Sequence, residues 1–204
     1  MTATIRDATF YLARPDSRSI ELRKLQGLWT EEQYLTITDR VNELIEFTDG
    51  YIEVLPMPTR KHQRILSFLN NLLRSIIRAQ GGEVLFAPLR LRVRAEKYRE
   101  PDLLLLLDAN DERNQERFWL GADLVVEIVS SDDPERDTVD KRADYAEAAI
   151  PEYWIVNPID ETIAVLVYAD AGYIEHGVFG RGATATSPLL GGLTIDVAAV
   201  FDAR

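Results

Sequence analysis

The chain has 204 residues, 46% of them hydrophobic, which is enough to bury one substantial core. No stretch approaches the roughly 20 apolar residues of a membrane helix, and the N-terminal segment lacks an apolar signal core, so we expect a cytoplasmic protein without a membrane partner. The absence of cysteine excludes disulfides, thiolate nucleophiles and cysteine-bound metal centres, and two histidines are too few for a histidine-rich metal site. Any catalytic metal must be held mainly by oxygen, which suits Mg²⁺ or Mn²⁺.

The charge is unevenly distributed along the chain. The net charge is -11, yet residues 60–99 hold ten Lys and Arg against Glu83 and Glu96, which makes +8 and leaves -19 for the remainder. This basic segment is either a surface that faces phosphate groups or a set of solvated arginines paired with acids elsewhere, and charge alone does not decide between them.

The first elements are short. Residues 1–28 lack clear periodicity, and we interpret them as an N-terminal arm or extension that precedes a single domain at 29–204. Thr30, with Gln33 three positions later, predicts an N-capped helix that runs to about Ile37.

A hairpin and a long helix follow. Residues 44–47 and 51–55 are β-prone runs on either side of Asp49-Gly50, a pair typical of tight hairpin turns. From 59 to 80 the apolar residues recur with the 3.6-residue period of an amphipathic helix, and Gly81-Gly82 ends it.

The second half of the chain predicts a sheet. Residues 89–94 alternate so that Arg90, Arg92 and Arg94 share one face of a strand. The nearly continuous apolar runs at 103–107 and 124–129 are typical of central strands covered on both sides, and the chain is therefore of the α/β class. The remaining expected elements are a helix from Pro134 to about Ala149, a strand at 153–156, a hairpin at 162–178 turning near Ala171-Gly172, and a short helix that includes 197–201.

Two acidic residues lie in these central strands. Asp102 stands immediately before the run at 103–107, and Glu127 lies within the run at 124–129. An ionised carboxylate there costs several kcal/mol unless it is paired or binds a metal. One such acid is equally well explained by a buried salt bridge, but two acids in adjacent central strands favour a functional role.

The order Pro101-Asp102, Glu127, Lys141 resembles the metal site of the PD-(D/E)XK nuclease superfamily. The chain is more closely similar to its bacterial "putative restriction endonuclease" family. The motifs that carry the resemblance are Asp49 to Glu53, His62, Pro101-Asp102, Val126 to Ser130, Lys141 to Tyr145 and Pro151 to Val156. It covers roughly residues 30–202 and implies a restriction-endonuclease-like core, in which helices flank a central mixed β-sheet with β-hairpin additions. The sequence departs from the superfamily pattern at Val129, where a lysine is expected, so the role passes to Lys141.

The resemblance implies a metal-dependent endonuclease acting on DNA. Asp102 and Glu127 would ligate one or two Mg²⁺ (or Mn²⁺) ions, with the main-chain carbonyl of Ile128 as a further ligand. Lys141 would orient the attacking water or neutralise the scissile phosphate. An ammonium group close to two carboxylates is also stabilised as a cation.

Further candidates have alternative interpretations. Glu53 could be an accessory catalytic carboxylate or simply exposed, and His62 could reach the same cleft from the start of the long helix or be a surface residue. Arg90, Arg92 and Arg94 could form a track for DNA phosphates, although the exposed face of a strand is commonly charged without function.

Two other functions remain open at this stage. In one, the fold is a catalytically silent, dimeric binding or assembly module in which Asp102, Glu127 and Lys141 form a buried ionic cluster; we expect a homodimer in either case. In the other, the same metal site hydrolyses a smaller phosphate ester and does not need the basic strand.

Overall fold

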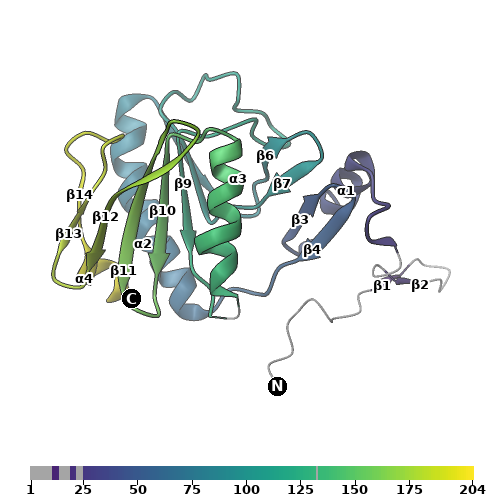
Figure 1. The fold of residues 1–204 in the computed structure, drawn as a ribbon, viewed down its shortest axis with the longest axis horizontal. Coiled ribbons are helices and arrows are strands. Elements are labelled where there is room, and N and C mark those ends of the chain that lie inside the picture. The colour runs from purple at the N-terminus through teal and green to yellow at the C-terminus, as the bar shows by residue number, and fades with distance from the viewer. Residues whose placement is uncertain (1–10, 14–18, 22–24, 132) are drawn as a thin grey trace.

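The computed structural model describes residues 11–13, 19–21, 25–131 and 133–204. Its central element is a six-stranded mixed sheet with the strand order β12-β11-β10-β9-β8-β5 (Figure 1). Strands β9 and β10 run parallel, and the other neighbouring strands of this sheet are antiparallel. The strands are β5 (Glu83–Phe86), β8 (Leu103–Leu106), β9 (Leu124–Ile128), β10 (Glu152–Asn157), β11 (Thr162–Ala169) and β12 (Gly172–Gly180).

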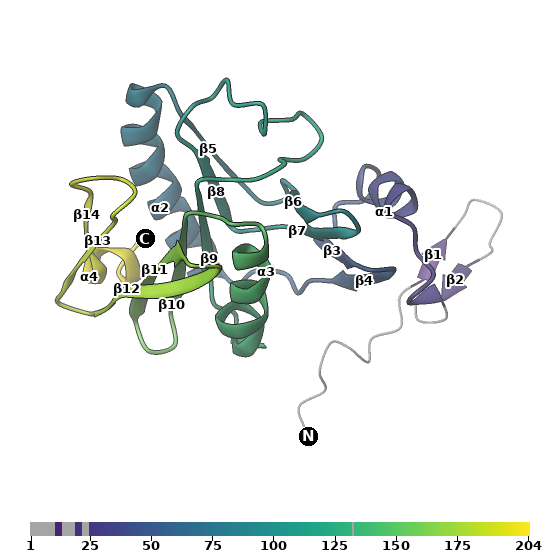
Figure 2. The ribbon, with the colours of Figure 1, turned by 45° about the horizontal axis from the view of Figure 1, so that its top comes forward.

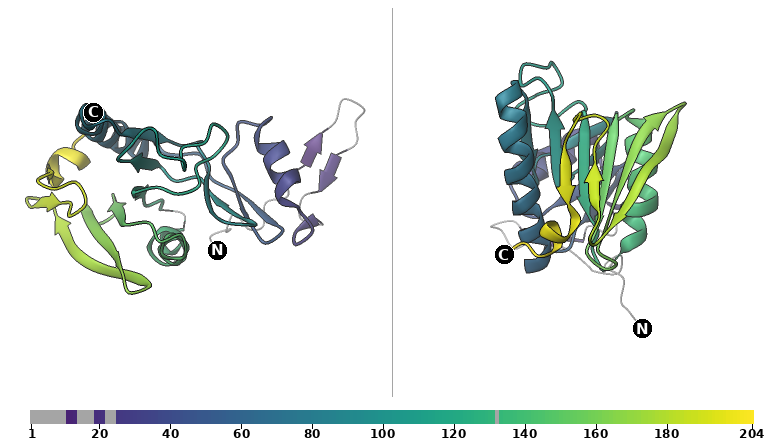
Figure 3. Two further views of the ribbon diagram at one scale, coloured as in Figure 1. Left: turned by 90° about the horizontal axis from the view of Figure 1, so that it is seen from above. Right: turned by 90° about the vertical axis from the view of Figure 1, so that its left-hand side faces the viewer.

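Helices cover both faces of this sheet. Helix α2 (Arg60–Ile77), continued by a 3₁₀ turn at Arg78–Gln80, packs on one face, and α3 (Lys141–Glu147) packs on the other (Figure 3). The α/β class and the mixed sheet flanked by helices are therefore confirmed. The helix expected from Pro134 contains a π-helical turn, Arg136–Asp140, directly before α3.

The two central strands contribute side chains to both cores, because successive residues of a strand point to opposite faces. Leu103, Leu105, Leu124, Val126 and Ile128 belong to the core beneath α2. Leu104, Leu106, Val125 and Val129 belong to the core beneath α3. The same alternation places Asp102, immediately before β8, and Glu127 of β9 on the face of the sheet that α3 covers.

A second, four-stranded sheet with the order β4-β3-β7-β6 lies beside the main sheet together with α1 (Figure 2). An aromatic core joins its layers, since Tyr34 of α1 stacks on Phe47 at 5.0 Å and contacts Tyr98 at 5.4 Å between ring centroids. Its elements are α1 (Glu31–Thr38), β3 (Ile45–Thr48), β4 (Tyr51–Val54), β6 (Leu91–Arg94) and β7 (Lys97–Arg99).

Short elements complete the described fold. They are β1 (Tyr11–Ala13) paired with β2 (Ser19–Glu21), β13 (Thr184–Thr186) paired with β14 (Thr194–Asp196), and α4 (Val197–Phe201). Of the expected N-terminal arm, residues 1–10, 14–18 and 22–24 lie outside the described residues. Residues 25–28 contact the domain: the Gln26 side chain exchanges two hydrogen bonds with the main chain of Ile52, and the Gly27 N–H donates to the Gly50 carbonyl.

Local signals predicted several boundaries correctly. Thr30 and Gln33 form the expected capping box of α1. Asp49 and Gly50 adopt φ values of 48° and 87°, the left-handed conformation that a tight hairpin turn requires. The second hairpin turns at Asp170 and Ala171, one residue before the expected position. Strands β1, β2, β7, β13 and β14 have only three residues each, too few to show a period, and were not predicted; the four-residue strand β5 was also not predicted.

No helix in the described part of the chain combines the length and the apolar character needed to cross a membrane.

We expect alanine substitutions at Gly81 and Gly82, the two glycines that follow α2 and its 3₁₀ turn, to lower the free energy of unfolding by different amounts. Gly81 has a φ of 88° with open space around it, whereas a Cβ at Gly82 would lie 2.4 Å from the main-chain oxygen of Leu106. We expect Gly81→Ala to cost about 1–2 kcal/mol of unfolding free energy through backbone strain alone. Gly82→Ala should cost about 3 kcal/mol, because β8 must move away. Urea denaturation of the two variants checks this order, and equal costs would contradict it.

Candidate active site

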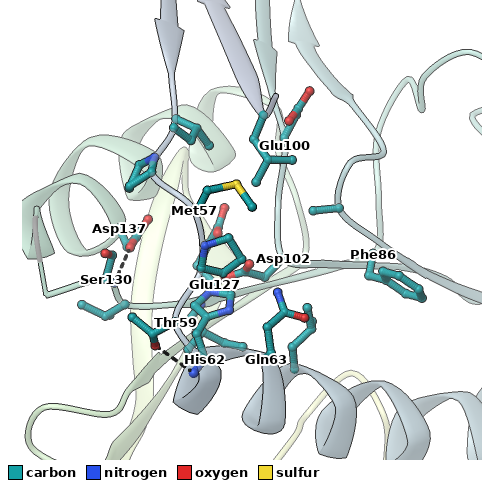
Figure 4. Close-up of a pocket in the computed structure, with 18 of the residues that line it drawn as sticks. Met57, Thr59, His62, Gln63, Phe86, Glu100, Asp102, Glu127, Ser130 and Asp137 are labelled. Carbon is teal, nitrogen blue, oxygen red and sulfur yellow. Dashed lines mark hydrogen bonds and ion pairs between the residues drawn. The ribbon is translucent and has the colours of Figure 1, made fainter. Parts of the chain in front are cut away.

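The two carboxylates predicted from the central strands face the same pocket. Leu103 pairs with Val126 in the antiparallel register of β8 and β9, and one further step places Asp102 opposite Glu127. Both side chains line a pocket of about 620 Å³ (Figure 4). The structure therefore brings together the two acids whose burial was the strongest signal in the sequence.

Asp102 is held by the neighbouring strand and by α2. Its Oδ2 accepts a 2.7 Å hydrogen bond from the main-chain N–H of Ile128 and lies 3.1 Å from Nε2 of His62. His62 occupies the first turn of α2, where its N–H donates to the hydroxyl of the N-cap residue Thr59. Burial lowers the pKa of the His62 imidazole, but the hydrogen bond and charge of Asp102 raise it more, so the net pKa lies above its ordinary value. This favours the imidazolium that pairs with Asp102.

Glu127 is the buried centre of the site. Its Oε1 accepts a 2.8 Å hydrogen bond from Nζ of Lys141 and a short one from the Tyr145 hydroxyl. Burial raises the pKa of Glu127 to about 8 against the opposing attraction of Lys141. Burial lowers the pKa of Lys141, but Glu127, Glu46 and Asp137 together raise it, so the ammonium group stays charged.

The π-helical turn places several charged groups around the pocket. Lys141 follows directly after it, with Nζ 3.3 Å from Asp137 one turn earlier. Asp137 is itself held, because the Tyr153 hydroxyl donates a 2.6 Å hydrogen bond to its carbonyl. Isolated π turns within helices are frequent at functional sites. This turn gives Lys141 and Asp137 their shared orientation toward Glu127.

Two further buried acids complete the cluster and were not predicted. Glu46 of β3 lies 3.6 Å from Lys141 and 3.7 Å from Arg99. Burial raises its pKa, but Lys141 and Arg99 lower it more, and the net pKa lies below its ordinary value. Burial and the charge of Glu46 raise the pKa of Glu100 to about 8. Glu46 interrupts the apolar run Leu44 to Phe47, so the reasoning applied to Glu127 could have found it.

Glu53, the expected accessory carboxylate, lies at the edge of this cluster. It is opposite Glu46 in the β3–β4 register, on the outer strand β4, and its side chain is 46% exposed. It is 3.4 Å from Arg136 and is not among the residues that line the pocket. Glu46 therefore occupies the buried position for which Glu53 was considered.

The three arginines considered as a phosphate track have acidic partners and do not line the pocket. Arg90, which precedes β6, is buried and bonded to Asp39 at 2.8 Å. Arg92 lies 3.6 Å from Glu31. Arg94 bonds Asp49 at 2.7 Å and Glu147 at 2.8 Å. Their positions match the alternative interpretation, in which arginines pair with acids from elsewhere in the chain.

The donor set fits a hard divalent cation. Within the described residues, no three His, Asp or Glu side chains already converge as a ligand cage. Mg²⁺ does not require one, since it keeps several water ligands and is usually bound by one or two carboxylates and substrate phosphates. Asp102 and Glu127 supply two carboxylates in one pocket, and the buried Nδ1 of His62 and Oε2 of Glu100 have no partner among the described residues. The residues present are thus compatible with Mg²⁺ or Mn²⁺.

A family model described as "Putative restriction endonuclease", Uma2, matches residues 31–198. The chain belongs to the Uma2 family. The matched segment contains every residue of the site described above, from Glu46 to Lys141, and agrees with the resemblance seen in the motifs.

A solved structure confirms the fold. It is the crystal structure of "a putative nuclease belonging to DUF820" from Anabaena variabilis, which matches with a TM-score of 0.67 and 20% sequence identity. The match covers 82% of this chain and 96% of that chain. At 20% identity this likeness concerns the fold alone. No curated protein matches the chain.

Proposed function

We propose that the chain is a metal-dependent endonuclease that hydrolyses phosphodiester bonds of DNA in the cytoplasm. The observation that carries the proposal is the pair of opposed carboxylates, Asp102 and Glu127, in one pocket with the buried ammonium group of Lys141. Membership of the Uma2 family, whose description names a restriction endonuclease, supports a nuclease role.

Asp102, Glu127 and the main-chain carbonyl of Ile128 are the groups that would hold Mg²⁺ or Mn²⁺. When bound, the ion supplies a Lewis acid and a water of lowered pKa. The N–H of Ile128 fixes the Asp102 carboxylate at 2.7 Å, which sets its direction before any ion or substrate enters. Such fixed orientation of a ligand is what a supporting hydrogen bond provides.

Lys141 and His62 control charge around these carboxylates. Lys141 has three N–H donors and three acidic neighbours within 3.6 Å, so it stabilises the site while no cation is bound there. In the reaction its charge would neutralise the scissile phosphate or orient the attacking water. His62 lines the pocket and holds the Asp102 carboxylate in place through Nε2.

One observation favours the alternative of a catalytically silent dimeric module. Lys141 and Tyr145 both bond to Oε1 of Glu127, so the acid is already satisfied without a metal. In that case the cluster is a buried ionic network with no turnover. A metal titration separates the two functions, because only the nuclease binds Mg²⁺ or Mn²⁺ through Asp102 and Glu127.

The test of the proposed function is a cleavage assay on purified protein with plasmid, linear and single-stranded DNA and with RNA. We expect DNA cleavage in Mg²⁺ or Mn²⁺ and none in EDTA, since the carboxylates alone cannot generate a nucleophile at neutral pH. Calorimetric titration of Mn²⁺ into the protein without DNA gives a second readout. Asp108→Asn is the matched acidic control, because Asp108 is exposed and lies outside the pocket. Cleavage that persists in EDTA, or the absence of both cleavage and metal binding, would refute the proposal.

A further inference from the structure

The solvent face of α2 carries an arginine stripe, which we define as Arg60, Arg64, Arg74 and Arg78. All four side chains are exposed. At 3.6 residues per turn, Arg60, Arg64 and Arg74 fall within about 80° of one another around the helix axis. The opposite side of the helix buries Ile65, Leu66, Leu69, Leu73 and Ile77 against the sheet. The stripe therefore points away from the core, and α2 itself forms an outer layer of the molecule (Figure 3).

No described carboxylate pairs with these four arginines, in contrast to the arginines in and next to the second sheet. The β6 arginines and Arg90 all have acidic partners within 4.0 Å, and so do Lys97 and Arg99. The described residues provide no such partner for the stripe, although the chain carries a net charge of -11. Helix α2 and the turn that continues it contain no Asp or Glu at all. In an acidic protein, this leaves one basic surface without internal compensation.

The position of the charges in the helix adds a second observation. Acidic residues are favoured in the first turn of a helix and basic ones are disfavoured, by roughly 0.3–1 kcal/mol each, because of the helix dipole. The first turn of α2 contains Arg60, Lys61 and His62 and no acid. Lys61 donates to the Pro158 carbonyl at 2.8 Å and lies 3.9 Å from Glu161, whereas no acid among the described residues pairs with Arg60. An external anion at this end of α2 would relieve the unfavourable charge.

The stripe begins at the candidate active site. Lys61, His62, Gln63, Ser67 and Asn70, from the first three turns of α2, line the pocket that contains Asp102 and Glu127. Figure 4 shows His62 and Gln63 rising from the helix toward Asp102. A DNA strand whose scissile phosphate reaches the pocket can continue along the outer face of α2. Polar Ser67 and Asn71 separate the two pairs of arginines and are also exposed.

We propose that the arginine stripe binds the phosphate backbone of duplex DNA and guides it to the pocket. The proposal rests on the proposed function for the identity of the polymer. From Arg60 to Arg78 the helix rises about 27 Å. This corresponds to about 8 base pairs of DNA at 3.4 Å per step. Contacts to phosphate from arginine side chains carry no sequence information, so the surface would set affinity and position.

The experiment measures binding without catalysis. A fluorescently labelled duplex several times longer than the about 8 base pairs of the stripe is titrated with protein in EDTA at a series of salt concentrations. The variant Arg74→Ala/Arg78→Ala removes the half of the stripe that lies farther from the pocket. We expect its affinity at about 0.1 M salt to fall tenfold or more and the slope of log K against log salt to decrease by about 1.8, since each phosphate contact contributes about 0.9.

The matched control is Arg40→Ala/Arg142→Ala, which removes the same charge from exposed arginines without a described acidic partner. Arg40 follows α1, and Arg142 is on α3, on the other face of the sheet. We expect its salt slope to match wild type, and thermal melts verify that both variants fold. Wild-type affinity and slope for Arg74→Ala/Arg78→Ala, or equal losses in both double variants, would overturn the proposal. Binding through α2 with no metal-dependent cleavage would instead refute the proposed function, and cleavage with unchanged binding would refute only the stripe.

Discussion

Lys141→Met is expected to lower the free energy of unfolding by about 3–5 kcal/mol, the cost of removing one partner of a buried ion pair. The Lys141 side chain is 3% exposed and lies 2.8 Å from Glu127, 3.3 Å from Asp137 and 3.6 Å from Glu46. Methionine is also unbranched, is one heavy atom shorter than lysine, and cannot donate a hydrogen bond. The three acids would then share a buried volume from which their principal cation has been removed. Guanidinium denaturation of the variant and the wild type measures the difference.

Two further variants identify the cause of this loss. Lys61→Met removes a lysine whose side chain is 50% exposed and whose nearest acid, Glu161, lies at 3.9 Å, so we expect a change of at most about 1 kcal/mol. Lys141→Met/Glu127→Gln should recover part of the stability, because the acid closest to the lost ammonium group, at 2.8 Å, is also removed. A Lys141→Met protein as stable as wild type would show that the cluster adjusts by protonation, and the double variant would then recover nothing.

The main elements of the fold could be predicted because their signals are local. The apolar positions from Ile65 to Ile77 recur with a 3.6-residue period and so predict α2. The continuous apolar runs at 103–106 and 124–128 predict the central strands. Short strands such as β7 and β14 have three residues each and pair with strands close in sequence, β6 and β13. Three residues are too few for a period to appear, so within the second sheet the hairpin of β3 and β4 and the alternating strand β6 were predicted, and β7 was not.

The site was predictable where a charge interrupts an apolar run. Glu127 satisfies this criterion, and Glu46 satisfies it equally. Asp137 could not be found in this way, because it lies in a polar segment and enters the site only through the π-helical turn. The alternation at Arg90, Arg92 and Arg94 predicted that these side chains share one face of a strand, but it did not predict which acidic residues pair with them. Asp39, Glu31 and Glu147 reach those arginines from helices or helix ends remote in sequence. In the described part of the chain, no acid reaches the α2 arginines in this way.

The second large effect concerns Asp102, on which the proposed chemistry depends. We expect Asp102→Asn to reduce metal-dependent DNA cleavage about a thousandfold or more, because Lewis-acid stabilisation by a bound ion is worth several kcal/mol and 1.36 kcal/mol corresponds to a factor of ten. The asparagine oxygen can still accept the hydrogen bond from Ile128, so the fold should be retained. Calorimetry should show weaker Mn²⁺ binding in parallel.

The control for this variant lies beyond the other end of the same strand. Asp108 is exposed, and among the described residues its side chain is hydrogen-bonded to Asn110 alone. Asp108→Asn makes the same chemical change away from the pocket. It should cleave DNA and bind Mn²⁺ like wild type. If Asp102→Asn retained both cleavage and Mn²⁺ affinity, the carboxylate would not be a metal ligand. The hydrogen bonds of Asp102 with Ile128 and His62 would then be sufficient to explain why an acidic residue stands immediately before β8. Loss of cleavage with unchanged Mn²⁺ binding would instead place Asp102 in substrate or proton handling and leave Glu127 as the principal ligand.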